Sequence, residues 1–219
     1  MLGVVFFMVL VERDFKILRL LYDWEFCLGR QIRELAGFSG QRATDRRLKK
    51  LRDEQLIDRK RVLYGVPSLY TVTNTGKKLI GADVKHDTKI RIDLINHNIN
   101  VIDTAIYILD KYKISYESMT TEKTLHKADG FGKRRHRPDF IFFHSDKVYC
   151  VEVELTLKAK SRMKANLKDN YLDYDYQLWV VPNHQGKILE ILRECKDLYP
   201  NIYTVPLEEV IKHVHNELD

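Results

Sequence analysis

The chain has 219 residues and a mass of 26.0 kDa, and 44% of its residues are apolar. This is enough apolar material for one large domain or two small ones, and it excludes a disordered chain. Lysine and arginine (37) exceed aspartate and glutamate (31), and the isoelectric point is 9.1. The basic balance favours an acidic polymer as a partner.

Cysteine spacing and the N-terminal segment bear on where the protein works. The three cysteines, Cys27, Cys150 and Cys195, lie far apart and lack the spacing of a disulfide framework or a zinc site. We therefore expect a reduced, cytoplasmic setting. The apolar segment 1–11 has no basic leader and is far short of the ~20 residues that span a bilayer. We interpret it as a buried strand or first helical turn, or as sequence upstream of a start at Met8, and expect no membrane partner.

Charge is distributed unevenly along the chain. Residues 1–81 carry 16 Lys or Arg against 9 Asp or Glu, whereas residues 82–219 carry 21 against 22. The segment 41–61 alone holds nine basic and four acidic residues. Such asymmetry between halves predicts two modules, of which the first is basic.

Apolar residues spaced three and four apart predict helices in the first module. We expect three helices, over 14–26, 28–36 and 41–55, with a Gly-Phe-Ser-Gly turn at 37–40. Helix, turn and basic helix is the order of a helix-turn-helix. A strand over 56–63, a turn at 64–67 and a returning strand over 68–73 follow, and Asn74 or Thr75 then caps a further helix.

The stretch LIDRKRVLYGVPSLYTVTNTGKKLI resembles the hairpin and threonine-glycine helix start of bacterial winged-helix proteins. In a helix-turn-helix the second helix enters the major groove, and its exposed basic side chains meet phosphates and base edges. Double-stranded DNA is therefore the expected partner, and the alternative is a solvated face that contacts other proteins. The candidate DNA-binding residues are Arg42, Arg46, Lys49 and Lys50 on the helix and Arg59, Lys60 and Arg61 on the hairpin.

Residues 85–113 carry apolar side chains at helical spacing without an internal glycine or proline. This predicts one long helix or two short ones that connect the modules. The chain then divides into a winged-helix DNA-binding domain at 1–82, a helical connector at 83–113 and an α/β domain at 114–219.

The C-terminal part begins with a predicted strand over 116–121 and a polar loop over 122–133. Pro138 suits the first residue of a strand over 138–143 that carries Asp139. A second strand over 148–155 places Glu152 and Glu154 on one face, because alternate residues of a strand share a face. The two strands form a hairpin, so Asp139 and the glutamates would meet at one end of a sheet.

Carboxylates this close raise each other's pKa unless a cation lies between them, and Mg²⁺ takes carboxylate oxygens in this way. A metal site is one interpretation. The other is a pair of edge charges that face solvent or pair with Arg135 and Arg137.

Pro138-Asp139 and Glu152, thirteen residues on, resemble the signature of the PD-(D/E)xK nuclease fold. The resemblance implies that Asp139 and Glu152 bind Mg²⁺. It also implies that Glu117 is the acidic residue preceding the motif, and Glu154 is a further candidate metal ligand.

The sequence departs from this signature at the catalytic lysine. The lysine is expected two residues after Glu152, where this chain has Glu154. Lys158 and Lys160, at the start of the following helix, are the candidates to replace it. Without a replacement, the nuclease-like fold serves binding alone.

The remaining pattern predicts a helix over 158–170, a strand over 177–182, a helix over 188–198, a strand over 202–205 and a helix over 207–218. Strands alternating with helices give a mixed sheet covered by helices. The expected fold class is α/β (α+β): an N-terminal winged helix-turn-helix, a helical connector and a mixed-sheet, restriction-endonuclease-like domain.

The whole arrangement resembles the replication-relaxation family of plasmid and mobile-element proteins, through the helix LINHNINVIDTAIYIL, Arg137-Pro138-Asp139 and Glu152-Val153. The resemblance implies a DNA-binding protein acting in replication, conjugative transfer or its control, with a degenerate nuclease-like domain. The alternative is a Mg²⁺-dependent DNA endonuclease targeted by its winged helix. A transcription regulator whose C-terminal half senses a ligand or dimerises is a third hypothesis. A homodimer and replication or conjugation proteins are further candidate partners.

Overall fold

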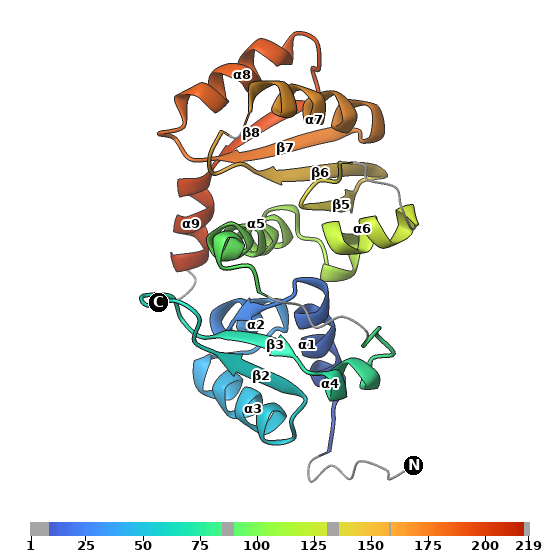
Figure 1. The fold of residues 1–219 in the computed structure, drawn as a ribbon, viewed down its shortest axis with the longest axis vertical. Helices are drawn as coiled ribbons and strands as arrows, with labels where there is room; N and C mark the ends of the chain where they lie inside the picture. The colour runs from blue at the N-terminus through green and yellow to red at the C-terminus, as the bar shows by residue number, and fades with distance from the viewer. Residues whose placement is uncertain (1–8, 85–89, 131–135, 158, 217–219) are drawn as a thin grey trace. The chain divides into compact units, whose positions relative to one another are not determined.

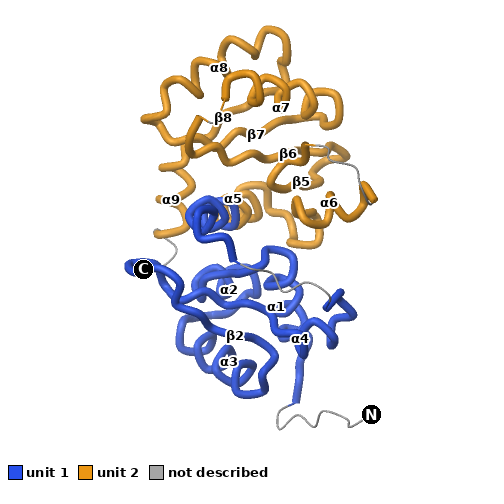
Figure 2. The backbone as a smooth tube through the Cα atoms, viewed as in Figure 1, with its two compact units in different colours: residues 1–102 blue, residues 103–219 orange. Residues whose placement is uncertain are grey.

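The computed structural model describes residues 9–84, 90–130, 136–157 and 159–216. The chain forms two compact units, Met1–Ile102 and Asp103–Asp219 (Figure 2). The boundary falls inside helix α5 (Ile95–Tyr112), which lies in the stretch that the sequence assigned to a connector. Each unit has its own sheet. The division into three parts stays a prediction.

Unit 1 contains the predicted helices and the predicted hairpin, with ends shifted by a few residues. Its elements are α1 (Glu12–Asp23), β1 (Cys27–Leu28), α2 (Gly29–Leu35), α3 (Gln41–Asp53), β2 (Ile57–Lys60), β3 (Leu69–Val72), α4 (Asn74–Leu79), the 3-10 helix η1 (Ile92–Leu94) and the start of α5. The two-residue strand β1 was not predicted. It pairs with β3, and the antiparallel sheet has the order β1-β3-β2 (Figure 1).

Local chemistry sets two of these helix ends. Gly37, with a φ of 67°, ends α2, and the Phe38 amide donates to the Arg33 carbonyl at 2.9 Å. Helix α4 is capped by Thr73, whose Oγ1 accepts from the Gly76 amide at 3.1 Å. The prediction that Asn74 or Thr75 caps this helix was therefore wrong by one or two residues.

The interior of unit 1 lies between α1, α3 and the sheet. The spacing of apolar residues predicts that Ala43, Leu48, Leu51 and Leu56 face inward, and the three leucines are fully buried. Ala43 is only half-buried, and Thr44 takes the inner position instead because its hydroxyl donates to the Gly40 carbonyl at 3.0 Å.

The described part of the N-terminal segment is not buried. Val9 is 83% exposed and Val11 is 48% exposed, and α1 begins only at Glu12. The expected buried strand or helical turn is therefore wrong for these residues, and the rest of the segment, 1–8, lies outside the described residues.

Unit 2 is a sheet with helices on both faces. Its elements after α5 are η2 (Tyr116–Ser118), β4 (Met119–Thr121), α6 (Glu122–Asp129), β5 (Phe140–His144), β6 (Lys147–Val153), α7 (Lys160–Asp173), β7 (Tyr176–Val181), α8 (Gly186–Lys196), β8 (Ile202–Pro206) and α9 (Leu207–Asn216). Helix α6 occupies most of the predicted polar loop, so that prediction was wrong for 122–129. The Glu122 amide donates to the Asp139 carbonyl at 2.9 Å and holds the start of α6 beside the sheet.

The five strands confirm the predicted mixed sheet. Their order is β4-β5-β6-β7-β8, in which β4, β5 and β6 are antiparallel and β6, β7 and β8 are parallel. Helices α7 and α8 cover one face (Figure 1), where Trp179 and Leu167 are fully buried among apolar side chains. On the opposite face Tyr149 stacks between Phe142 and Tyr176, with ring centroids 4.7 and 4.6 Å away.

All three cysteines are buried, and none of them forms a disulfide bond. Among the residues that the structure describes, no helix is long and apolar enough to cross a membrane.

Candidate functional site

The outer face of α3 is basic. Arg42, Arg46, Lys49 and Lys50 are all exposed, and helical geometry places them within an arc of about 100°. Leu48 and Leu51 occupy the opposite, buried side. Since the core fixes the buried side of α3, it also fixes the direction in which the four cations point.

Arg47 is the exception among the basic residues of α3. Its Nε donates to Asp14 Oδ1 at 2.6 Å, and its Nη2 donates to Asp14 Oδ2 and to the Val9 carbonyl. The Asp14 side chain is 1% exposed and also accepts from the Val11 amide at 2.8 Å. Arg47 therefore ties α3 to the start of α1, and its charge is compensated.

The hairpin between β2 and β3 carries the other three predicted cations, Arg59, Lys60 and Arg61, and all three are exposed. Arg59 lies over the Tyr70 ring, 5.8 Å from its centroid, and Lys60 lies 3.4 Å from the Asp58 carboxylate at the surface. Salt bridges this exposed contribute little, so they leave the cations available to other anions. The structure thus brings all seven candidate DNA-binding residues to the surface of unit 1.

In unit 2 the structure brings Asp139 and Glu152 together. Strands β5 and β6 pair Phe140 with Val151, so the register continued by one residue sets Asp139 opposite Glu152. Asp139 Oδ2 accepts from the Val153 amide at 2.7 Å, which fixes the carboxylate at the end of the ladder. The predicted meeting of these two carboxylates at one end of a sheet is therefore seen.

Glu152 is held in place by two side chains, and the sequence analysis predicted neither of them. His136 Nε2 lies 2.6 Å from Glu152 Oε1, and Asn170 Nδ2 donates to the same oxygen at 2.9 Å. The Glu152 side chain is 11% exposed, and Asn170 is 1% exposed. His136 precedes the Pro138-Asp139 pair, whereas Asn170 lies on α7, so the site joins three segments of the chain.

Burial and charge shift the pKa of both members of this pair. Burial lowers the pKa of His136, but the hydrogen bond and charge of Glu152, with the charges of Asp169 and Asp139, raise it above its ordinary value. Burial raises the pKa of Glu152, and the hydrogen bond from His136 offsets this only in part. The two carboxylates therefore favour the charged form of His136 beside them.

Arg137, which lies near this site, pairs with another carboxylate. Arg137 Nε donates to Asp129 Oδ2 at 2.8 Å, and its Nη2 donates to the other oxygen of the same carboxylate. The interpretation in which Arg137 pairs with Asp139 or Glu152 was therefore wrong, because Arg137 joins α6 instead. Arg135 lies outside the described residues.

Two other predicted site residues lie away from the pair. Glu117 lies in η2, before β4, in which Met119 pairs with Phe142 and Thr121 pairs with Phe140. It is therefore placed toward the end of β5 opposite to Asp139. Lys160 Nζ lies 3.2 Å from Glu194 Oε2 on α8, and it is about 15 Å along α7 from Asn170. The metal and catalytic roles of Glu117 and Lys160 stay predictions.

Glu154 and Lys158 complete the predicted set. Glu154 follows β6, is half-buried, and continues the ladder through its amide, which donates to the Val180 carbonyl at 3.0 Å. Alternation along the strand puts it farther along the face that carries Glu152. Lys158 lies outside the described residues.

The surroundings of the two carboxylates decide whether their oxygens can bind Mg²⁺. This ion needs carboxylate oxygens with room for direct coordination. Here Glu152 Oε1 faces two nitrogen groups, and Asp139 Oδ2 accepts from a backbone amide. Within the part of the chain that the structure describes, no group of three or more His, Cys, Asp or Glu could hold a metal ion. In this arrangement the described residues do not fit Mg²⁺.

The sequence pattern contains a signal for two of the buried or half-buried polar residues that were not predicted, and none for the third. Arg47 falls on α3 next to the buried positions Leu48 and Leu51, and Asn170 comes three residues after buried Leu167. Both spacings indicate an inward-facing polar residue that needs a partner. Nothing comparable marks His136, whose partner Glu152 is sixteen residues away.

The fold defines an α/β protein with two candidate sites. The first is the basic helix and hairpin of unit 1, and the second is the pair of carboxylates in the mixed-sheet unit. Residues 18–175 match the model of the replication-relaxation family, and the chain belongs to this family. Membership indicates a role in the replication or transfer of a plasmid or other mobile element. Searches of curated proteins and of solved structures gave no significant match.

Proposed function

We propose that this chain is a DNA-binding protein of a plasmid or other mobile element that acts in its replication or transfer. Unit 1 is a winged-helix domain that binds double-stranded DNA, and the carboxylate site of unit 2 is a degenerate nuclease site. The observation that carries the proposal is the set of seven exposed cations on α3 and on the hairpin after it.

Charge and placement both support DNA binding by unit 1. The four cations of α3 form one stripe on the helix that follows the turn, which is the position of the recognition helix in a helix-turn-helix. Phosphate contacts from such side chains supply most of the affinity and release counterions, so binding weakens as salt rises.

The surroundings of Glu152 support a degenerate site. A metal-dependent nuclease needs open carboxylate oxygens and a basic group beside the attacking water. Here an imidazole and an amide face Glu152 Oε1, and Lys160 pairs with Glu194. The second candidate function, a Mg²⁺-dependent endonuclease, is favoured by one observation, the placement of Asp139 opposite Glu152.

A matched pair of variants tests DNA binding. The first replaces Arg42, Arg46, Lys49 and Lys50 by alanine. The control removes four exposed cations of unit 2 by Lys168→Ala, Lys187→Ala, Arg193→Ala and Lys212→Ala. Both variants lose the same net charge, so a purely nonspecific charge effect weakens duplex binding equally in both. The proposal predicts that only the α3 variant loses affinity and that its salt slope falls by about 3 to 4. Equal loss in both variants contradicts it.

A cleavage assay separates the two candidate functions. Supercoiled plasmid is incubated with the full chain and Mg²⁺ or Mn²⁺, with EDTA as the control. The proposal predicts intact supercoils in every reaction. Metal-dependent nicking that disappears in Asp139→Ala establishes the endonuclease instead.

A further inference from the structure

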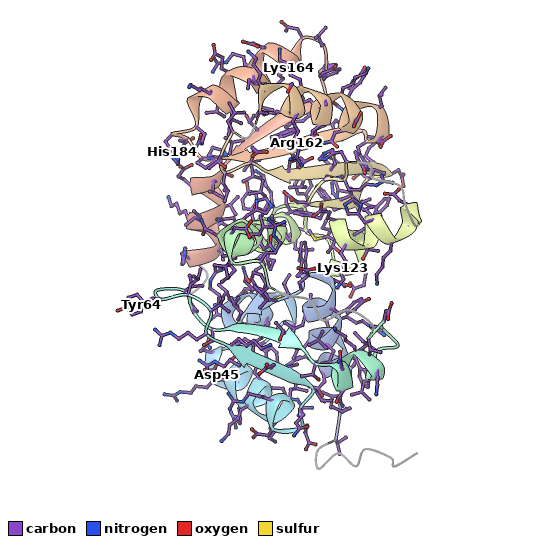
Figure 3. All side chains as sticks on the ribbon, in the orientation of Figure 1. Asp45, Tyr64, Lys123, Arg162, Lys164 and His184 are labelled. Carbon is purple, nitrogen blue, oxygen red and sulfur yellow. The ribbon has the colours of Figure 1, made fainter. Side chains whose placement is uncertain are left out.

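The most exposed described aromatic ring of unit 1 lies at the tip of the hairpin between β2 and β3. Tyr64 is 97% exposed, and its side chain points away from the hairpin (Figure 3). Aromatic side chains carry a large apolar surface, and burying that surface is favourable. A ring left fully in water therefore offers contact area to a partner.

The chain on either side of Tyr64 is anchored, so the ring does not hang from a loose loop. Val62, Leu63 and Val66 pack against a buried cluster that contains Phe26 and Leu69. Gly65 has a φ of 79°, which lets the chain turn directly after the ring. The fold partly buries Val62, Leu63 and Val66 and leaves the Tyr64 ring outward.

One cation lies beside the ring, and two more precede it on the same hairpin. The Arg61 guanidinium lies 5.9 Å from the centroid of Tyr64, and Lys60 and Arg59 follow on the same exposed hairpin. A cation beside an aromatic ring suits a nucleotide, because the cation meets the phosphate while the ring packs on the sugar or base. The same combination suits an apolar protein surface less well, because burying the cations there carries a desolvation cost.

We propose that Tyr64 is a DNA-contacting residue whose ring packs against a nucleotide of the duplex bound by unit 1. This inference rests on the proposed function, since it names a contact of the same DNA-binding surface. The contact is apolar, so it adds affinity without neutralising a phosphate. It therefore differs from the contacts of the seven cations in its response to salt.

Fluorescence anisotropy with the full chain and a labelled duplex over a salt series tests the inference. Tyr64→Ala should weaken binding about tenfold at every salt concentration and leave the salt slope unchanged. Arg61→Ala should lower the slope by about one. Tyr64→Phe should bind like the parent chain, because the ring and not the hydroxyl makes the contact. Phe143→Ala is the control for an exposed aromatic residue elsewhere, since Phe143 is 50% exposed on β5, and it should have no effect.

The outcomes separate this inference from the proposed function. If the parent chain binds no duplex, both fail. If the parent chain binds and Tyr64→Ala binds within twofold of it, the inference fails alone. Sedimentation of the same variants examines a protein partner: a change in self-association with unchanged DNA affinity assigns the ring to an interface between chains and overturns the inference.

Discussion

The pair between Arg47 and Asp14 gives the sharpest stability prediction. Replacing Arg47 by alanine leaves the Asp14 carboxylate buried, with its side chain 1% exposed. Removing one partner of a buried ion pair costs about 3–5 kcal/mol. Asp14 keeps the Val11 amide as a donor, and the Arg47 side chain is 21% exposed. We therefore expect a loss of stability at or below the lower end of this range. The free energy of unfolding of unit 1 should fall by about 2–3 kcal/mol.

The neighbouring cation provides the control. Arg46 is exposed on the outer face of α3, and Arg46→Ala should change stability by less than about 0.5 kcal/mol. Adding Asp14→Asn to Arg47→Ala should recover part of the loss, because the uncompensated charge is removed. The two variants should also separate roles: Arg46→Ala weakens DNA binding, whereas Arg47→Ala weakens the fold.

Urea unfolding followed by tryptophan fluorescence measures this effect in one unit. The chain has two tryptophans, Trp24 in unit 1 and Trp179 in unit 2. A Trp179→Phe background therefore reports on unit 1 alone, which matters because a chain of two units need not unfold in one step. Equal stabilities for Arg47→Ala and Arg46→Ala would refute the assignment of Arg47 to a buried pair.

Three further predictions concern a close contact, a proton and a metal. A Cβ at Gly76 would lie too close to the Leu56 carbonyl oxygen, so Gly76→Ala should destabilise unit 1 by about 2 kcal/mol or more in urea unfolding. Gly186→Ala is the control, because a Cβ there meets nothing within 4 Å, and it should not destabilise the chain. The pKa of His136 is raised in the folded chain, against the effect of burial, mainly by the hydrogen bond and charge of Glu152. Its stabilising effect is therefore complete below about pH 6.5 and is lost as pH rises through the folded pKa. Unfolding measured from pH 6 to 9 should show this loss, and Glu152→Gln should reduce it. Millimolar Mg²⁺ should leave the thermal unfolding midpoint unchanged, and a metal-dependent rise that disappears in Glu152→Gln would show that the site holds the ion.

Local sequence pattern predicted most of the elements because each has its own signal. Helix α3 has buried leucines at helical spacing. Strand β6 is an apolar run interrupted by Glu152, and β7 is one interrupted by Gln177. The hairpin was visible because turn residues separate two short strands. Helix α6 was missed because its eight residues include only Leu125 and Ala128 as apolar residues. Its start is held by a bond to the carbonyl of Asp139, which is distant in sequence.

Part of the candidate site was likewise predictable from local sequence, and part was not. The meeting of Asp139 and Glu152 was predictable, because a hairpin fixes which residues face each other. The contacts of Glu152 with His136 and Asn170 join residues sixteen and eighteen positions apart through a loop and a helix. No local pattern encodes such contacts, since they depend on how α7 packs on the sheet. The position of Glu117 could not be predicted for the same reason, because it depends on the register of β4.

Retardation and nicking of supercoiled plasmid by the full chain, in Mg²⁺ across a salt series, test DNA binding and cleavage together. We expect retardation that weakens steeply with salt, because several phosphate contacts contribute to binding, and supercoils that stay intact. Absence of retardation at low salt contradicts DNA binding by unit 1. Nicking that requires Mg²⁺ and Asp139 contradicts the degenerate site and makes the protein a nuclease.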